Sequence, residues 1–263
     1  MPLLRIQIYQ PQAHYRIPFT YSRRHSYAIP PYSTIIGFLC NACGIDDQNR
    51  VLYKTIRELK ISISGQFKSK LTEMIWFRNV SKEAHVRTYG SIDHREKNGQ
   101  IGHIGGQSPI SIDVLQDVKL LIYLYHKEKE KLETLKVKLE NPVDRLQVLH
   151  IGRAEDWLVY KSIDFIDDSK FEYKRRDGNY KYFTWIPEKI FSLNGNTVNW
   201  DNFDGITYLL TTHSHIQNYE NHRNHTGKRF YEKIKAKLNE GKIIQSQCIF
   251  DKELNIPVFL GDL

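Results

Sequence analysis

Apolar and polar residues alternate over residues 4–9, which is the period-two pattern of a half-buried strand. From Ser33, a residue suited to cap a helix, apolar residues recur at helical spacing as far as Gly44, which can end the helix. A short second helix is predicted over 51–56, and residues 59–63 alternate again. The first part of the chain is therefore expected to form a strand, two helices and a strand.

The same order of elements returns after a long gap. Residues 118–125 alternate as a strand, and leucines spaced along 127–140 indicate a helix that Asn141-Pro142 ends. A strand over 146–149 then leads into Gly152. The full order of strand, helix, strand, insertion, strand, helix and strand predicts an α+β fold with the split β-α-β arrangement of ferredoxin-like domains.

Helices cover only one face of such a sheet, so the polar residues of the alternating strands would lie on the other face. RNA-recognition domains bind RNA on that face, but their aromatic signature is absent here. We expect the rest of the chain to cover this face, with RNA contact as the alternative. The residues concerned are Arg5, Gln7, Tyr9, Lys119, Tyr123 and Tyr125.

An insertion at about 68–116 is too long for an ordinary loop. Five of the chain's 15 glycines lie within 90–106, and basic residues including Arg78, Arg87 and Arg95 are spread along the insertion. This composition predicts a mobile, basic finger. A solvated surface loop is the alternative.

The C-terminal part has a less regular pattern. Residues 171–185 have the pattern of a hairpin that turns at Asp177-Gly178, with basic residues interleaved with tyrosines. Such a hairpin suits contact with RNA or protein, or only the protection of a sheet edge. A helix is predicted over 227–240. We therefore expect one domain over 1–155 and a β-rich region over 156–263 that contains this terminal helix.

Composition narrows the functional classes. The chain has 263 residues, of which 40% are hydrophobic, enough for a sizeable core. A net charge of +8 favours polyanionic partners, and 16 tyrosines offer rings on which bases can stack. No apolar run approaches a membrane span, no signal peptide is recognised, and three cysteines make no disulfide framework. A cytoplasmic location is expected.

Two clusters have the residue types of metal or redox sites. Cys40 and Cys43 have the spacing of such a pair, but they lie in a predicted amphipathic helix with no second pair after them, so buried structural cysteines are the preferred interpretation. Four histidines before the last predicted helix lack a supporting cysteine or carboxylate set. We expect no metal and no cofactor. The histidines are His213, His215, His222 and His225.

Two further segments carry the strongest functional signal. Residues 149–160 run from an apolar strand into Gly152, which permits close backbone approach or positive φ, and then into Arg153, whose forked guanidinium suits a phosphate. Residues 29–39 place two prolines before the first predicted helix. Together these segments resemble the CRISPR-associated protein family five, most closely its type I-B branch.

The resemblance implies an RRM-like RAMP domain whose insertion is a thumb that folds over RNA or a neighbouring subunit. It implies a protein that holds the 5′ handle of CRISPR RNA in the Cascade surveillance complex, touches the large subunit and the repeated backbone subunit, and meets target DNA indirectly. The helix start suits a phosphate, with simple helix packing as the alternative. The expected RNA-binding residues are Pro31, Tyr32, Ser33, Thr34, Gly152 and Arg153 from the two segments, and Arg78, Arg87 and Arg95 from the insertion.

Catalysis is the main alternative function. Metal-independent RNA cleavage needs a base near the ribose 2′-hydroxyl and an acid or cation near the leaving oxygen. The branch of the family that cuts precursor CRISPR RNA uses a tyrosine, a lysine and a histidine, and we cannot place that set in this chain. Glu155 and Asp156 are adjacent in a predicted strand, so they would not converge on one metal. We expect a non-catalytic RNA-binding subunit, with an endoribonuclease or a basic binding module unrelated to CRISPR as alternatives.

Overall fold

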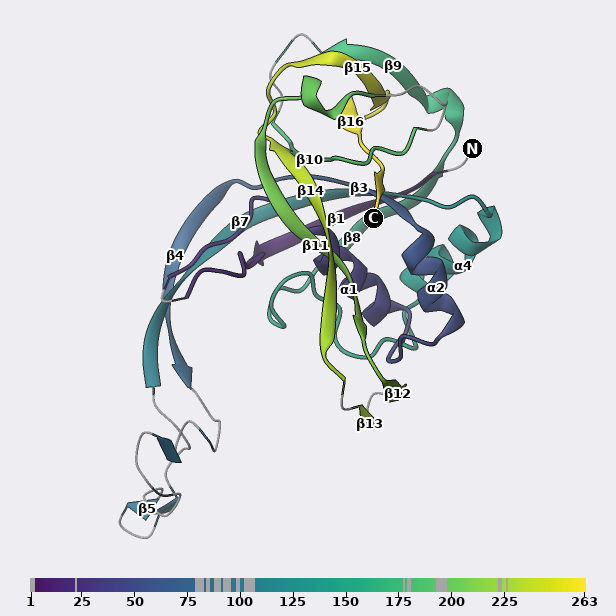
Figure 1. Cartoon of the computed structure of the whole chain (residues 1–263). Coiled ribbons are helices and arrows are strands. Elements are labelled where there is room, and N and C mark those ends of the chain that lie inside the picture. Colours follow the sequence, from purple (N-terminus) through teal and green to yellow (C-terminus); the bar gives the residue numbers. More distant parts are fainter. Residues whose placement is uncertain are drawn as a thin grey trace.

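An antiparallel sheet with helices on one face forms the centre of the molecule (Figure 1). The computed structural model describes residues 3–21, 23–78, 107–176, 181–192, 198–221 and 227–263, with single positions and pairs between these ranges. Four strands lie in the order β3-β7-β1-β8, and each neighbouring pair is antiparallel. These strands are β1 (Leu3–Ala13), β3 (Lys60–Gln66), β7 (Gln107–Tyr125) and β8 (Val159–Ile166).

Three helices make the two crossovers of this sheet. The helices α1 (Tyr32–Ala42) and α2 (Val51–Glu58) connect β1 to β3, and α4 (Lys129–Glu140) connects β7 to β8. The strand order and the crossovers together give split β-α-β connectivity. The predicted α+β class and all three predicted helices of this part are confirmed.

The strand predicted over 146–149 is wrong. Residues 146–148 form a bend and Leu149 has no regular structure, and the fourth strand of the sheet is β8. Two backbone N–H groups of the segment bond to α1 instead of to a strand: Leu146 donates to the carbonyl oxygen of Asn41 at 3.1 Å, and Gln147 donates to the Asn41 side chain at 2.9 Å. The segment is thereby held beside the helix.

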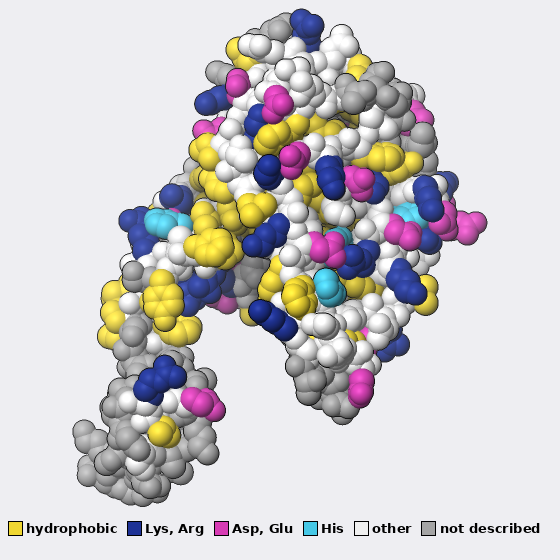
Figure 2. Space-filling model, in the orientation of Figure 1, with side chains coloured by type: hydrophobic (Ala, Val, Ile, Leu, Met, Phe, Trp, Pro, Cys, Tyr) yellow, Lys and Arg dark blue, Asp and Glu magenta, His cyan; other side chains and the backbone are white. Residues whose placement is uncertain are grey.

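The described strands of the insertion form an arm that projects from the sheet (Figure 1). Strand β4 (Ser69–Arg78) pairs with the first part of β7 along its whole length, and β2 (Arg23–Arg24) runs parallel to β7. Hydrophobic side chains gather on the arm (Figure 2). In β4, Met74 and Trp76 are exposed, and because they are two residues apart they lie on one face of the strand. The described part of the predicted finger is thus a paired hairpin. Two short strands lie beyond it, β5 (Glu96–Lys97) and β6 (Gln100–Ile101).

The C-terminal half is β-rich, as predicted, and it extends the central sheet beyond β3. A second, three-stranded sheet packs above it, in the order β16-β15-β9. The strands in the central sheet are β10 (Phe183–Pro187), β11 (Ile206–Ile216), β14 (Arg229–Asn239) and β17 (Gly261–Asp262). The second sheet contains β9 (Phe171–Arg176), β15 (Ile244–Asp251) and β16 (Ile256–Val258). The remaining elements are β12 (Tyr219–Asn221), β13 (Asn224–His225) and the 3-10 turns Asp168–Lys170 and Trp200–Asn202.

Two predictions for this half are wrong. Residues 171–185 are not a hairpin, because β9 pairs with β15 whereas β10 pairs with β3 and β14. Residues 227–240 contain the strand β14 instead of a helix. Ile234, Ala236 and Leu238 are buried, and the lysines between them point to the other face, so the true period of this segment is two.

The sheet face opposite the helices is covered over part of its area, as expected. Tyr123 and Tyr125 pack in a cluster with residues of β15 and β16. Arg5 forms a buried ion pair with Asp251 at 2.7 Å, and the Tyr123 hydroxyl donates to the same carboxylate at 2.8 Å. The C-terminal sheet is thus fastened to this end of the face, whereas the end that carries Tyr9 and Lys119 is left uncovered.

Candidate functional site

The start of α1 has the features of an anion-binding helix end. Its N-cap is Pro31, which offers no side-chain cap, and the first turn contains no acidic residue. Ser33 and Thr34 are half-buried, and their hydroxyls lie in this first turn. The positive end of the helix dipole is therefore not compensated by a capping side chain.

Tyr32 anchors this helix in the core. Its side chain is fully buried, and its hydroxyl has no hydrogen-bond partner within the described part of the chain. Burial raises the pKa of the phenol well above its usual value. The structure therefore places Tyr32 beneath the surface to which Ser33 and Thr34 belong.

Gly152 is required by the fold of the second segment. Its φ is +112°, a conformation that side chains disfavour. A Cβ atom here would stand 2.7 Å from the Asp156 carboxylate and 2.9 Å from the carbonyl oxygen of His14. The positive φ and close approach expected from the sequence are both confirmed.

A buried carboxylate organises the bend that follows. Asp156 is 0% exposed and accepts from the backbone N–H groups of His14 at 2.9 Å and Arg153 at 2.7 Å. The amide of Gln10 donates to the carbonyl oxygens of Ile151 and Asp156, both at 2.9 Å. These bonds fasten residues 151–156 to β1 and to the residue after it.

The Arg153 guanidinium is engaged by carboxylates. It contacts Asp156 at 2.8 Å and Glu155 at 3.3 Å, and the side chain is only 16% exposed. Burial opposes the charged form, but the bonds to Asp156 outweigh it and raise the pKa of Arg153. A phosphate at Arg153 would compete with both carboxylates. The main role of this side chain is therefore to stabilise the bend.

The two segments meet at one pocket of about 370 Å³. Ser33, Thr34 and Gly37 line it from α1, and His150 and Gly152 line it from the bend. The contact between Asn41 and the 146–149 segment holds these walls together. Residues more than a hundred positions apart in the sequence are thus brought to one surface.

A second pocket, of about 690 Å³, adjoins the first across α1. The two pockets share Ser33, Thr34, Gly37 and Cys40, and we call the joined surface the α1 groove. The second pocket is lined by both cationic and aromatic side chains, and none of its lining residues is a carboxylate. These side chains are Arg16, Lys233, Phe19, Tyr27, Tyr53 and Tyr231.

The sequence did not lead us to predict Gly37, Arg16 or Lys233 as site residues. Gly37 is exposed, and a Cβ atom there would have no neighbour within 4 Å, so packing does not require glycine. Glycine inside a helix is less stable than alanine. A glycine within the predicted helix was therefore the signal in the sequence that could have pointed to Gly37. Arg16 and Lys233 join the groove only through the tertiary fold.

Among the described residues that line the α1 groove, none comes from the insertion. Arg78 is the last residue of β4, on the projecting arm (Figure 1). Arg87 is exposed, and Arg95 lies outside the described residues. Their RNA-binding role stays a prediction.

The cysteine pair is structural in character. Cys43 is buried and Cys40 is half-buried, and both are free thiols. Burial raises the pKa of Cys40 to about 12 and that of Cys43 to about 11. Both thiols are therefore protonated at neutral pH and poor nucleophiles.

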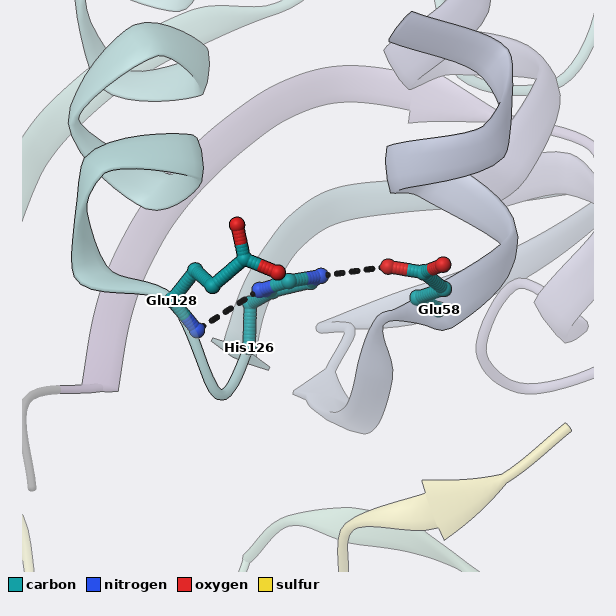
Figure 3. A group of neighbouring side chains, drawn as sticks. All are labelled: Glu58, His126 and Glu128. Atoms are coloured by element: carbon teal, nitrogen blue, oxygen red, sulfur yellow. Dashed lines mark hydrogen bonds and ion pairs between the residues drawn. The ribbon is translucent and has the colours of Figure 1, made fainter. Parts of the chain in front are cut away.

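A separate cluster joins α2 to the start of α4 (Figure 3). The His126 Nδ1 atom accepts from the backbone N–H of Glu128 at 2.9 Å, so the neutral ring carries its proton on Nε2 and donates it to Glu58 at 2.9 Å. Lys131 lies 3.2 Å from the Glu58 carboxylate and 3.1 Å from that of Glu128. A metal would have to displace this ammonium and the ring proton, so the cluster is best explained as a fastening between helices.

The four histidines near 213–225 do not gather within the described residues. His213 is buried in β11, and His215 is half-exposed and stacks on Phe230. His222 and the side chain of His225 lie outside the described residues. The predicted absence of a metal there therefore stays a prediction.

His213 is expected to make folding stability depend on pH. Burial and the nearby Arg57 lower its pKa from 6.5 to about 4, although Glu232 opposes this. The unfolded chain binds the proton more readily, so stability is full above about pH 6.5 and falls by on the order of 3 kcal/mol towards pH 4. Denaturant unfolding of H213L across this range should show a flatter pH slope than the parent. The buried neighbour variant T212V should keep the parent slope, and an unchanged slope in H213L would contradict the assignment.

The split β-α-β sheet with its projecting arm defines a ferredoxin-like α+β protein. A family model described as CRISPR-associated protein (Cas_Cas5) matches residues 3–237, and the chain therefore belongs to this family. A comparison with curated proteins finds no match. The type I-B branch is a finer assignment that the family match does not address.

Solved structures resemble this fold at low sequence identity. A chain of a structure named "CRISPR RNA-guided surveillance complex" is 9% identical, with a TM-score of 0.52, over 94% of this chain and 91% of that chain. A "Crystal structure of Cas protein" is 14% identical at a TM-score of 0.43, over 99% of this chain and 100% of that chain. A CRISPR protein from Archaeoglobus fulgidus is 12% identical at a TM-score of 0.40, over 99% of this chain and 92% of that chain. Among the described helices, none has the length and apolar character needed to cross a membrane.

Proposed function

We propose that this protein is the non-catalytic subunit that caps the 5′ handle of CRISPR RNA in a type I, I-B-like Cascade complex in the cytoplasm. The observation that best supports this proposal is that the start of α1, which follows two prolines, and the bend at Gly152 line one pocket. Membership of the Cas5 family supports the same function.

The α1 groove has the chemistry that a single-stranded handle needs. The uncapped helix start and the Ser33 and Thr34 hydroxyls suit a phosphate. Arg16 and Lys233 add positive charge, and Phe19 and Tyr231 offer exposed rings for stacking bases. Binding by phosphate contact and stacking needs no nucleophile.

The projecting arm supports contact with other subunits. Its exposed Met74 and Trp76 form the kind of apolar surface that soluble proteins usually bury against a partner. We assign to the arm a contact with the repeated backbone subunit or with the large subunit. Target DNA would then be met through the assembled complex.

The function is tested by incubating the purified chain with labelled repeat RNA in the presence of a chelator. Retention of intact RNA supports the binding subunit. Discrete cleavage that is lost on a single histidine or tyrosine substitution would establish the endoribonuclease instead. Failure to co-purify with other Cascade subunits would indicate a general basic binding module.

The substitution G37A should separate binding from folding. Alanine in a helix is more stable than glycine by about 0.5–1 kcal/mol, so the variant should resist denaturant slightly better. Its methyl group would stand in the α1 groove, where we expect it to weaken handle RNA binding by about 1–3 kcal/mol through loss of a close backbone contact. Filter binding and urea unfolding measure the two effects.

Gly178 provides the matched control for G37A. A Cβ atom there also has no neighbour within 4 Å, and Gly178 does not line the α1 groove. G178A should leave RNA affinity unchanged. Equal RNA affinity in G37A and the parent would remove α1 from the RNA site.

A further inference from the structure

The uncovered end of the sheet lies on the face opposite the helices. There the register places Tyr9 of β1 beside Lys119 of β7, and Lys119 beside Gln66 of β3. The alternate residues Ile8 and Leu120 belong to the core under the helices. Tyr9, Lys119 and Gln66 therefore form one row that points away from α1.

This row is hollowed into two adjoining pockets. One, of about 310 Å³, extends from Tyr9 and Lys119 to Lys161 and Tyr182. The other, of about 410 Å³, extends from the same two residues to Phe67, Lys68 and Lys181. We call the joined surface the lysine strip, and its basic residues are Lys68, Lys119, Lys161 and Lys181.

The charge of the lysine strip is strongly unbalanced. All four lysines are exposed, and Asp117 is the one carboxylate among the residues that line the two pockets. Asp117 accepts from the Tyr9 hydroxyl at 2.9 Å and lies 3.9 Å from Lys68. Within the described part of the chain, no carboxylate pairs with the other three lysines, which leaves them free for an anion.

Aromatic rings lie between these charges. The Lys161 ammonium lies 5.4 Å above the centre of the Tyr9 ring. Phe67, which lines the second pocket, stacks on Phe183 with ring centres 5.5 Å apart. Tyr182 lines the first pocket and is half-buried. Lysines interleaved with rings are the arrangement that binds single strands by phosphate contact and base stacking.

We propose that the lysine strip binds a second single-stranded nucleic-acid segment, distinct from any strand held in the α1 groove. The lysines would contact its phosphates, and the hollows beside Tyr9 and Tyr182 would take its unpaired bases. The sheet separates the two surfaces, so one short strand cannot occupy both. The inference does not depend on handle binding, because it uses none of the residues of the α1 groove.

The test measures binding of fluorescent single-stranded RNA and DNA oligonucleotides of mixed sequence that lack the repeat. The K119Q/K161Q double variant should weaken binding at least tenfold. It should also lower the slope of log affinity against log salt by about 1.4, since each phosphate contact to a single strand contributes about 0.7. The RNA and DNA arms show which kind of strand is preferred.

A double variant with the same change in net charge tests whether the loss of affinity comes from net charge alone. K129Q/K136Q removes two lysines from α4, on the helix side of the sheet, and should change affinity less than twofold. Similar losses in both double variants, or no loss in K119Q/K161Q, would overturn the proposal. Unchanged oligonucleotide binding with loss of a protein subunit from the complex would assign the strip to a protein contact instead. G37A should retain the strip's binding, which keeps failure at the α1 groove distinguishable from failure here.

Discussion

The substitution D156N is expected to destabilise the fold by about 3–5 kcal/mol. Asp156 is fully buried, and its carboxylate receives two backbone N–H groups and the Arg153 guanidinium. The neutral amide leaves the exposed Glu155 as the remaining ion-pair partner of the largely buried Arg153 among the described residues. Chemical denaturation followed by circular dichroism measures the loss.

The neighbouring carboxylate supplies the control. Glu155 is 58% exposed in its side chain and contacts the same guanidinium at 3.3 Å, so E155Q should cost under about 1 kcal/mol. If E155Q and D156N destabilised the protein equally, the bend would not depend on the buried carboxylate. The comparison is sharp because both variants remove one negative charge beside Arg153.

The substitution R5M should have an effect of similar size, about 3–5 kcal/mol, at the other end of β1. It leaves Asp251, which is 0% exposed, without its charged partner, although the Tyr123 hydroxyl and the backbone N–H of Glu253 still donate to it. The C-terminal sheet would lose its fastening to the central sheet. Thermal and urea unfolding followed by tryptophan fluorescence report the change.

Two further variants test the cause of this loss. E253Q removes the exposed partner that lies 3.0 Å from Arg5 and should cost under about 1 kcal/mol. The double variant R5M/D251L removes both buried charges and should be more stable than the sum of the single losses implies. Strict additivity would show that the two side chains do not interact energetically.

The elements predicted correctly are those whose signals are local. The helix α4 has a leucine stripe and ends at Asn141-Pro142, and both are visible in the sequence. Its burial pattern agrees, because Leu132, Leu135 and Leu139 are buried. A helix that carries its own stop signal can be identified without knowing its neighbours.

The strand β14 shows why the same reasoning fails elsewhere. Phe230, Ile234 and Leu238 are spaced by four residues, a spacing that satisfies both a helical and a two-residue period. Ala236 lies on the same buried face and favours the strand, but alanine is also the best helix former. Pairing with β10 and β11 decides the conformation, and that pairing is not visible locally.

The candidate site was predictable in position but not in detail. The sequence indicated Ser33, Thr34 and Gly152, which do line one pocket. It did not indicate that Tyr32 points into the core or that Arg153 is held by Asp156. Residue type shows which chemistry is available, whereas burial and competing partners decide whether a ligand can reach it.

Among the described strands β1 is made first, yet both of its neighbours in the sheet are made much later. Leu4 pairs with Leu124 of β7, and Leu3 pairs with Ile166 of β8. Until β7 is made, therefore, the nascent chain carries an apolar strand with two open edges, and the edge that pairs with β8 stays open until that strand follows, a state that invites aggregation. We expect the yield of native protein to depend on factors that shield the nascent chain, more than on treatments applied after release.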